Sequence, residues 1–176
     1  MGEGGSATGR FILGAPKKCV GCQSCMSACL VKHFTKDDIP IPRIRVIQID
    51  SYTTAVTCRH CQEAPCVTAC PVGALYYDGD RVAVEMNRCI ACYGCANSCP
   101  YGAITIATRH AGKSIGTMTL GQPYLQAVVK CDLCYDRAGG PACVEACTSD
   151  AIRLVERREL EQDTSKEDTN RIAVQI

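Results

Sequence analysis

The sequence predicts a small α+β fold of short helices and antiparallel strand pairs, with only a modest apolar core. Three observations support this prediction. The chain has 176 residues and 16 cysteines, a density typical of disulfide-linked or metal-binding proteins. Aromatic residues are few, with two Phe, seven Tyr and no Trp, so apolar packing alone would not hold the fold. The apolar residues fall in short alternating runs, which are typical of strands.

These runs place the elements in chain order. Residues 43–50 (RIRVIQID) alternate and predict a strand. Residues 74–86 (ALYYDGDRVAVEM) predict a hairpin, because two apolar runs flank Asp78-Gly79. Two more strands are predicted at 103–109 and 151–157. A Gly/Thr-rich loop is predicted at 110–123. Short helices are predicted around four cysteines, at 27–33, 67–70, 96–99 and 143–147.

The C-terminal segment has two interpretations. Residues 156–170 are almost wholly polar, as in a solvated tail. The chain nevertheless ends in the apolar sequence RIAVQI, which a solvating tail does not need. Residues 157–176 therefore also suit an arm that docks on a partner.

The sequence predicts neither a secretory signal nor a membrane span. Only FIL is apolar before Gly14, and no twin-arginine pair precedes it, whereas a signal needs at least about seven apolar residues and a membrane span roughly 20. We therefore expect a soluble cytoplasmic protein, unless a partner exports it. Disulfides rarely persist in the cytoplasm, which favours metal binding. The net charge of +1 gives no general attraction to nucleic acid.

The cysteines form four groups of four, and none is left over. Each group opens with a two-residue gap and closes with a three-residue gap, while the middle gap varies. The groups therefore form an internal repeat. Group one is Cys19, Cys22, Cys25 and Cys29; group two is Cys58, Cys61, Cys66 and Cys70. Group three is Cys89, Cys92, Cys95 and Cys99; group four is Cys131, Cys134, Cys143 and Cys147.

This spacing suits a [4Fe–4S] cube, which needs thiolates at four corners. Three closely spaced cysteines can wrap three corners. The fourth is expected at the start of a helix, pointing away from that cube. In two-cluster ferredoxins the fourth cysteine binds the other cluster, so two groups exchange their last cysteines. Structural zinc is an alternative, but the recurring third and fourth cysteines do not suit separate C-x2-C knuckles. Disulfides are another alternative and need an oxidising compartment.

These motifs resemble those of four-cluster, ferredoxin-like electron-transfer subunits of multisubunit oxidoreductases. The resemblance covers about residues 10–156. It is carried by PRIRVIQ, TCRHCQEAPCVTACPVGAL, RCIACYGCANSCPYGAI and VVKCDLCYDRAGGPACVEAC. Such subunits accompany molybdenum- or tungsten-pterin enzymes, such as formate dehydrogenases and aldehyde oxidoreductases, and close relatives serve hydrogenases and carbon monoxide dehydrogenases. Group four departs from the family pattern at Thr148, where proline is usual.

The resemblance implies four [4Fe–4S] clusters, with all sixteen cysteines as iron ligands. Cluster one would take Cys19, Cys22, Cys25 and Cys147, and cluster two Cys29, Cys131, Cys134 and Cys143. Cluster three would take Cys58, Cys61, Cys66 and Cys99, and cluster four Cys70, Cys89, Cys92 and Cys95. The fold would be two linked bacterial-type ferredoxin units. The inner unit, residues 58–99, would be inserted into an outer unit of residues 10–57 and 100–156.

No catalytic residues are predicted, because the sequence has no P-loop, dinucleotide-binding motif or nucleophile elbow. We expect a non-catalytic subunit that relays single electrons. Its partners would be a large catalytic subunit, with tungsten- or molybdenum-pterin types favoured, and a further redox subunit or ferredoxin. Self-association could join chains into longer electron paths. The alternatives are a subunit of a hydrogenase or carbon monoxide dehydrogenase complex, and a free soluble polyferredoxin. A structural or nucleic-acid-binding zinc protein is disfavoured, because basic patches with interleaved aromatics are missing.

Several polar residues near the cysteines allow two interpretations. We interpret His33, His60 and His110 as surface or packed residues, because thiolates already fill each site. The basic residues beside cysteines either offset the negative charge of the clusters or form an ordinary solvated surface. They are Lys17, Lys18, Arg59, Arg88 and Lys130.

Overall fold

The computed structural model describes residues 9–34, 41–110, 113–115, 118–120 and 124–160. Within them, every sheet is an antiparallel pair of strands. The strands are β1 (Arg10–Gly14), β2 (Arg45–Ile49), β3 (Tyr52–Val56), β4 (Leu75–Asp78), β5 (Arg81–Val84), β6 (Thr105–His110), β7 (Lys113–Ile115), β8 (Met118–Leu120), β9 (Tyr124–Val129) and β10 (Ile152–Glu156). The helices are α1 (Ser24–His33), α2 (Pro65–Thr68), α3 (Gly94–Ser98) and α4 (Ala142–Glu145), with a 3-10 turn, η1, at Met86–Arg88.

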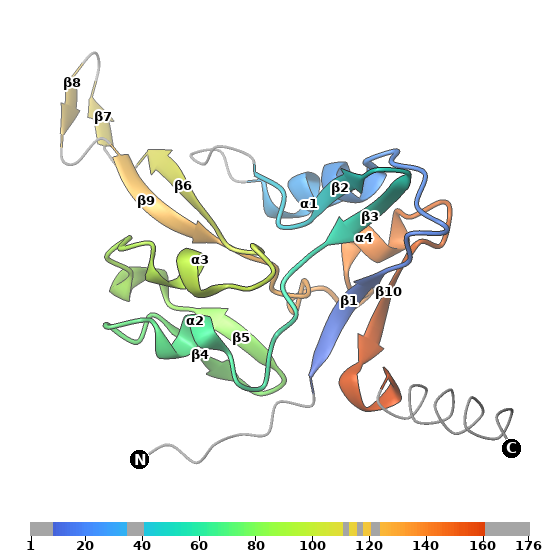
Figure 1. Cartoon of the computed structure of the whole chain (residues 1–176). Helices are drawn as coiled ribbons and strands as arrows, with labels where there is room; N and C mark the ends of the chain where they lie inside the picture. Colours follow the sequence, from blue (N-terminus) through green and yellow to red (C-terminus); the bar gives the residue numbers. More distant parts are fainter. Residues whose placement is uncertain (1–8, 35–40, 111–112, 116–117, 121–123, 161–176) are drawn as a thin grey trace, which may run out of the picture.

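The elements gather in two halves that lie side by side (Figure 1). The first half contains α1, α4, β1, β2, β3 and β10. The second half contains α2, α3, β4 and β5, with β6 and β9 beside them, while β7 and β8 project away. The packing within each half agrees with this view, because α1 contacts α4 and α2 contacts α3.

The first half joins the two ends of the described chain. β1 pairs with β10, and Phe11 lies opposite Val155. Gly14, at the end of β1, also approaches β3 closely. A Cβ atom at Gly14 would lie 2.6 Å from the Ala55 carbonyl oxygen, so a side chain would not fit there. The apolar core of this half contains Ile12, Ile44, Ala55, Leu133 and Ile152 among buried cysteines.

The second half is organised by the β4–β5 hairpin, in which Leu75 lies opposite Val84. Its apolar core contains Ala64, Leu75, Val82, Ile104 and Val128, together with buried Cys66 and Cys95. Ile104 and Val128 come from the segment that the sequence analysis assigned to the outer unit. Their packing places the start of β6 and the end of β9 against the core of the second half.

The predicted strands and hairpin are present, as β2, β4–β5, β6 and β10. Five strands were not predicted, namely β1, β3, β7, β8 and β9. The predicted loop at 110–123 is wrong in part, because Lys113–Ile115 pairs with Met118–Leu120. β7 and β8 have three residues each, and a run that short does not allow alternation to be recognised in the sequence.

The helices begin earlier in each cysteine group than predicted. Each starts one residue before the third cysteine, whereas the fourth was expected at the helix start. The residue before the helix explains this position. Gln23 and Tyr93 have left-handed backbones immediately before α1 and α3, so the chain reverses there. Pro65 is at the start of α2 and Pro141 caps α4, and the fixed φ of proline suits a helix start.

Arg157, the first residue of the predicted tail, packs against the first half. Its N–H donates to the Gly9 carbonyl oxygen at 3.2 Å, and its guanidinium donates to the Arg59 carbonyl oxygen at 3.2 Å. The guanidinium also lies 5.4 Å from the Phe11 ring centroid. Most of the proposed docking arm, residues 161–176, lies outside the described residues. In the described part of the chain, no helix is long and apolar enough to cross a membrane.

Candidate metal centres

The sixteen cysteines are all free thiols, and most are buried or half-buried. Two are exposed, Cys22 and Cys92, which are the second cysteines of groups one and three. Both apolar cores contain cysteines. Cys25, Cys29, Cys58, Cys131 and Cys143 lie in the first core, and Cys66 and Cys95 in the second. Thiol sulfur therefore occupies positions that larger apolar side chains would fill in an ordinary core.

One backbone feature recurs in every group, two residues after the first cysteine. The residue there has a left-handed backbone: Gly21 (φ 73°), His60 (φ 44°), Ala91 (φ 54°) and Leu133 (φ 63°). A left-handed residue turns the chain sharply and so curls the loop around the sulfurs. Three of these four residues carry a side chain, for which this backbone costs roughly 1–2 kcal/mol. The loops therefore need a further contact that stabilises them.

Backbone N–H groups point at cysteine sulfurs. Within the loops, the N–H of Ala91 donates to Cys89 Sγ and the N–H of Leu133 donates to Cys131 Sγ, both at 3.4 Å. Such donors stabilise a thiolate, and hydrogen bonds to sulfur help to set the potential of an iron–sulfur cluster.

The fourth cysteine of each group also accepts a backbone N–H. In three groups the donor lies four residues later: Ala74 to Cys70 at 3.1 Å, Ala103 to Cys99 at 3.4 Å and Ala151 to Cys147 at 3.2 Å. In group one the donor is Arg43, at 3.2 Å from Cys29 Sγ. The difference arises because α1 continues to His33, so the residues after Cys29 are committed to the helix.

The first half brings groups one and four together. Burial raises the pKa of the Cys25 thiol, and three nearby thiols raise it further: Cys147, Cys19 and Cys22. Burial likewise raises the pKa of Cys143 to about 12, with smaller contributions from Cys29, Cys134 and Cys25. Cys147 therefore lies among the cysteines of group one, and Cys29 lies among those of group four.

The second half brings groups two and three together in the same manner. Burial raises the pKa of Cys66 to about 11, and three thiols add to this effect: Cys58, Cys99 and Cys61. Burial also raises the pKa of Cys95, with contributions from Cys89 and Cys70. The last cysteine of each group is thus near the other group of its pair.

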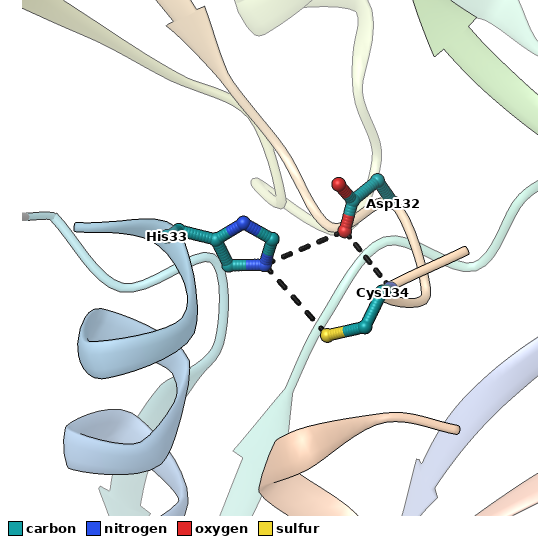
Figure 2. A group of neighbouring side chains, drawn as sticks. All are labelled: His33, Asp132 and Cys134. Atoms are coloured by element: carbon teal, nitrogen blue, oxygen red, sulfur yellow. Dashed lines mark hydrogen bonds and ion pairs between the residues drawn. The ribbon is translucent and has the colours of Figure 1, made fainter. Parts of the chain in front are cut away.

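Two polar side chains, His33 and Asp132, lie beside Cys134 (Figure 2). His33 Nε2 lies 3.7 Å from Cys134 Sγ and 3.5 Å from an Asp132 carboxylate oxygen. Asp132 accepts the Cys134 N–H at 3.0 Å and pairs with Arg43 at 2.5 Å. Burial and the Arg43 guanidinium lower the pKa of His33, whereas Asp132 raises it.

The ligand atoms of His33, Asp132 and Cys134 lie within 4.8 Å of one another. A zinc ion accepts such ligands, but Cys134 also acts on the thiols of Cys29 and Cys143. His33 and Asp132 are therefore better described as polar neighbours of a thiolate in group four. Sequence reasoning treated His33 as a surface or packed residue and did not single out Asp132 or Arg43. The acidic residue inside C-D-L-C marks Asp132, but nothing in the sequence places Arg43 or His33 beside it.

The residues fit [4Fe–4S] clusters. Sixteen unpaired thiols, curled loops and N–H groups aimed at sulfur are the environment that such clusters require. The chain matches the 4Fe-4S dicluster domain over residues 49–157 and a second 4Fe-4S dicluster domain over residues 18–75.

Three relatives from Escherichia coli align over most of their own length. The chain is 39% identical to the electron transport protein HydN over 160 residues, covering 87% of this chain and 91% of HydN. It is 39% identical to the putative electron transport protein YsaA, covering 84% of this chain and 90% of YsaA. It is 34% identical to hydrogenase-4 component A, covering 83% of this chain and 82% of that protein.

The fold, the thiol groups and these relatives define an iron–sulfur electron-transfer protein without catalytic activity of its own. The chain belongs to the 4Fe-4S dicluster domain family.

Proposed function

We propose that the chain holds four [4Fe–4S] clusters and relays single electrons between the catalytic subunit of an oxidoreductase and another redox partner. All sixteen cysteines serve as ligands, in the four sets that exchange the last cysteine of each group. When bound, a [4Fe–4S] cube accepts and passes one electron at a time. The protein positions the cubes, excludes water from them and tunes them through hydrogen bonds and charge.

The observation that carries this proposal is the crossing of the fourth cysteines. Cys147 is an electrostatic neighbour of Cys25, and Cys29 is one of Cys143. In the second half, Cys99 acts on Cys66 and Cys70 acts on Cys95. Four independent zinc knuckles would keep each group separate, whereas pairs of cubes require this exchange.

The arrangement supports an electron path that crosses both halves. Cys58 of group two acts on the buried thiol of Cys131 of group four, so clusters two and three would meet at the junction. The exposed Cys22 and Cys92 would belong to clusters one and four. Each has an exposed apolar neighbour, Val20 at 72% and Ile90 at 62%. We propose that these two ends face the redox partners. The two units are the inner residues 58–99 and the outer residues 10–57 and 100–156, with β6 and β9 covering the inner unit.

The identity of the catalytic partner has two candidates. The motifs favour a tungsten- or molybdenum-pterin enzyme of the formate or aldehyde oxidoreductase type. The similarity to hydrogenase-4 component A favours a hydrogenase complex. Both assign the same role to this chain, because the clusters move electrons in either complex.

Anaerobic purification of the untagged protein from its native cells tests this role. We expect a brown complex with a large subunit, which mass spectrometry would identify as a pterin enzyme or a hydrogenase. A chain truncated after Leu160 should keep its iron, because Cys147 and Arg157 remain, and should recover less of the large subunit if residues 161–176 dock. A brown monomer would instead indicate a free polyferredoxin. A colourless zinc protein would contradict the proposal.

A further inference from the structure

Lys130 is a basic residue in an unusual place. It directly precedes Cys131, the first cysteine of group four, and its exposure is only 5%. Lys18 and Arg88 occupy the same position in groups one and three, and both are exposed. A buried lysine is rare in proteins unless its charge is compensated. The basic residues beside cysteines, which look alike in the sequence, are therefore not equivalent.

The contacts of Lys130 join the two halves of the molecule. Its ammonium donates to the carbonyl oxygen of Cys131 at 2.9 Å and to that of Val82 in β5. The Val82 N–H in turn donates to His60 Nδ1 at 3.0 Å. His60 is 0% exposed and lies in the loop of group two. Lys130 thus sits where groups two and four meet.

The ammonium has no carboxylate partner among the residues that the structure describes. Carbonyl oxygens satisfy its N–H groups but do not neutralise a buried charge. His60 does not compensate it either, because an imidazole is neutral or positive and carries no negative charge. Asp132 lines the same pocket as Lys130 but pairs with Arg43. The cluster thiolates of groups two and four would supply the remaining negative charge.

These sulfurs belong to both pairs of groups. The Lys130 ammonium donates to the carbonyl oxygen of Cys131 itself, and through Val82 it is linked to His60, which lies between Cys58 and Cys61 in the loop of group two. Cys131 is a ligand of cluster two, and Cys58 and Cys61 are ligands of cluster three, in the proposed sets. A single buried cation therefore lies beside both proposed clusters at the junction.

We propose that Lys130 is the shared counter-cation of clusters two and three and raises the reduction potentials of both. The inference rests on the proposed four-cluster function. A fixed positive charge in a site of low dielectric favours the reduced, more negative form of each neighbouring cluster. Because one charge raises both potentials together, it adds no energetic step between the two clusters at the junction. Lys18, in the same sequence position but in water, has no such effect.

The test compares Lys130→Met with the matched control Lys18→Met and the conservative Lys130→Arg in the purified full-length protein. Redox titrations followed by electron paramagnetic resonance would give the potential of each cluster. Lys130→Met should lower the potentials of two clusters and leave the other two unchanged. Lys18→Met should leave all four near those of the native protein. Lys130→Arg should restore much of the shift, because it keeps the charge.

If Lys130→Met shifts no cluster, or shifts only one, the inference is wrong. If this variant loses iron, mapping of alkylated cysteines decides the matter. Exposure confined to the ligands of clusters two and three supports the shared role, and exposure of cluster one or four overturns it. If the native protein has four clusters and Lys130→Met shifts none of their potentials, this inference alone is overturned. A native protein with fewer clusters would overturn the proposed function instead.

Discussion

At the residue scale, the fourth cysteine of each group differs from the other three. It lies within or just beyond the helix that begins one residue before the third cysteine, and it accepts an N–H from outside the curled loop. It also lies near the thiols of the other group in its pair. Its position therefore depends on the tertiary fold, whereas the positions of the first three depend on one loop.

Cys147→Ala tests this distinction. Removing a ligand should remove or convert one cube, and we expect that cube to be the one on group one, because Cys147 acts on Cys25. Alkylation under anaerobic conditions, mapped by mass spectrometry, should newly label Cys19, Cys22 and Cys25. Cys134→Ala is the control and should expose Cys29, Cys131 and Cys143 instead. Labelling of Cys131 and Cys143 in the Cys147 variant would show that the groups do not exchange ligands as proposed.

At the element scale, the loops of groups one and three share one backbone conformation. Both have a left-handed residue before the helix, Gln23 and Tyr93, and a second one two residues earlier. That second residue is Gly21 in one loop and Ala91 in the other. The same left-handed backbone is therefore formed by glycine in group one and by alanine, which is strained there, in group three.

Exchanging these two residues should change stability in opposite directions. Ala91→Gly should raise the stability of the cluster-bound protein by about 0.5–1 kcal/mol, because relief of the left-handed strain exceeds the entropy that glycine adds to the unfolded chain. Gly21→Ala should lower it by about 1 kcal/mol, because alanine is strained in the left-handed backbone. The added Cβ would meet only Thr53 Cγ2, at 3.4 Å, so steric contact adds little to this strain. The apparent midpoint of cluster bleaching in guanidinium measures both. Equal midpoints in the two variants would show that loop strain does not limit stability.

The sequence predicted elements that carry a local signal. The Asp78–Gly79 turn between two apolar runs identified the β4–β5 hairpin, in which Asp78 pairs with Arg81. The helix starts were missed because they depend on left-handed residues such as Gln23 and Tyr93, whose side chains do not mark that backbone. β1 was missed because its partner, β10, lies at the far end of the described chain.

The same division applies to the candidate site. Cysteine spacing identified the ligand types, because spacing is a local property. The burial of Lys130 and the Arg43–Asp132–His33 group could not be predicted, because both arise where distant segments pack together.

At the scale of the whole molecule, two halves with separate cores share one junction. The first core includes Cys58, although this residue begins group two. Lys130 connects the same region to β5 through Val82. The halves are therefore joined through the surroundings of their cysteines, which fits a molecule whose purpose is to keep redox centres close to one another.

The central claim is that this fold carries four cubes, and metal content tests it most directly. Iron and acid-labile sulfide should be determined on anaerobically prepared full-length protein, with zinc measured alongside. The account predicts about sixteen iron and about sixteen sulfide per chain, because four cubes each contain four of both. A reproducible value near eight iron after reconstitution, or zinc in place of iron, would contradict it.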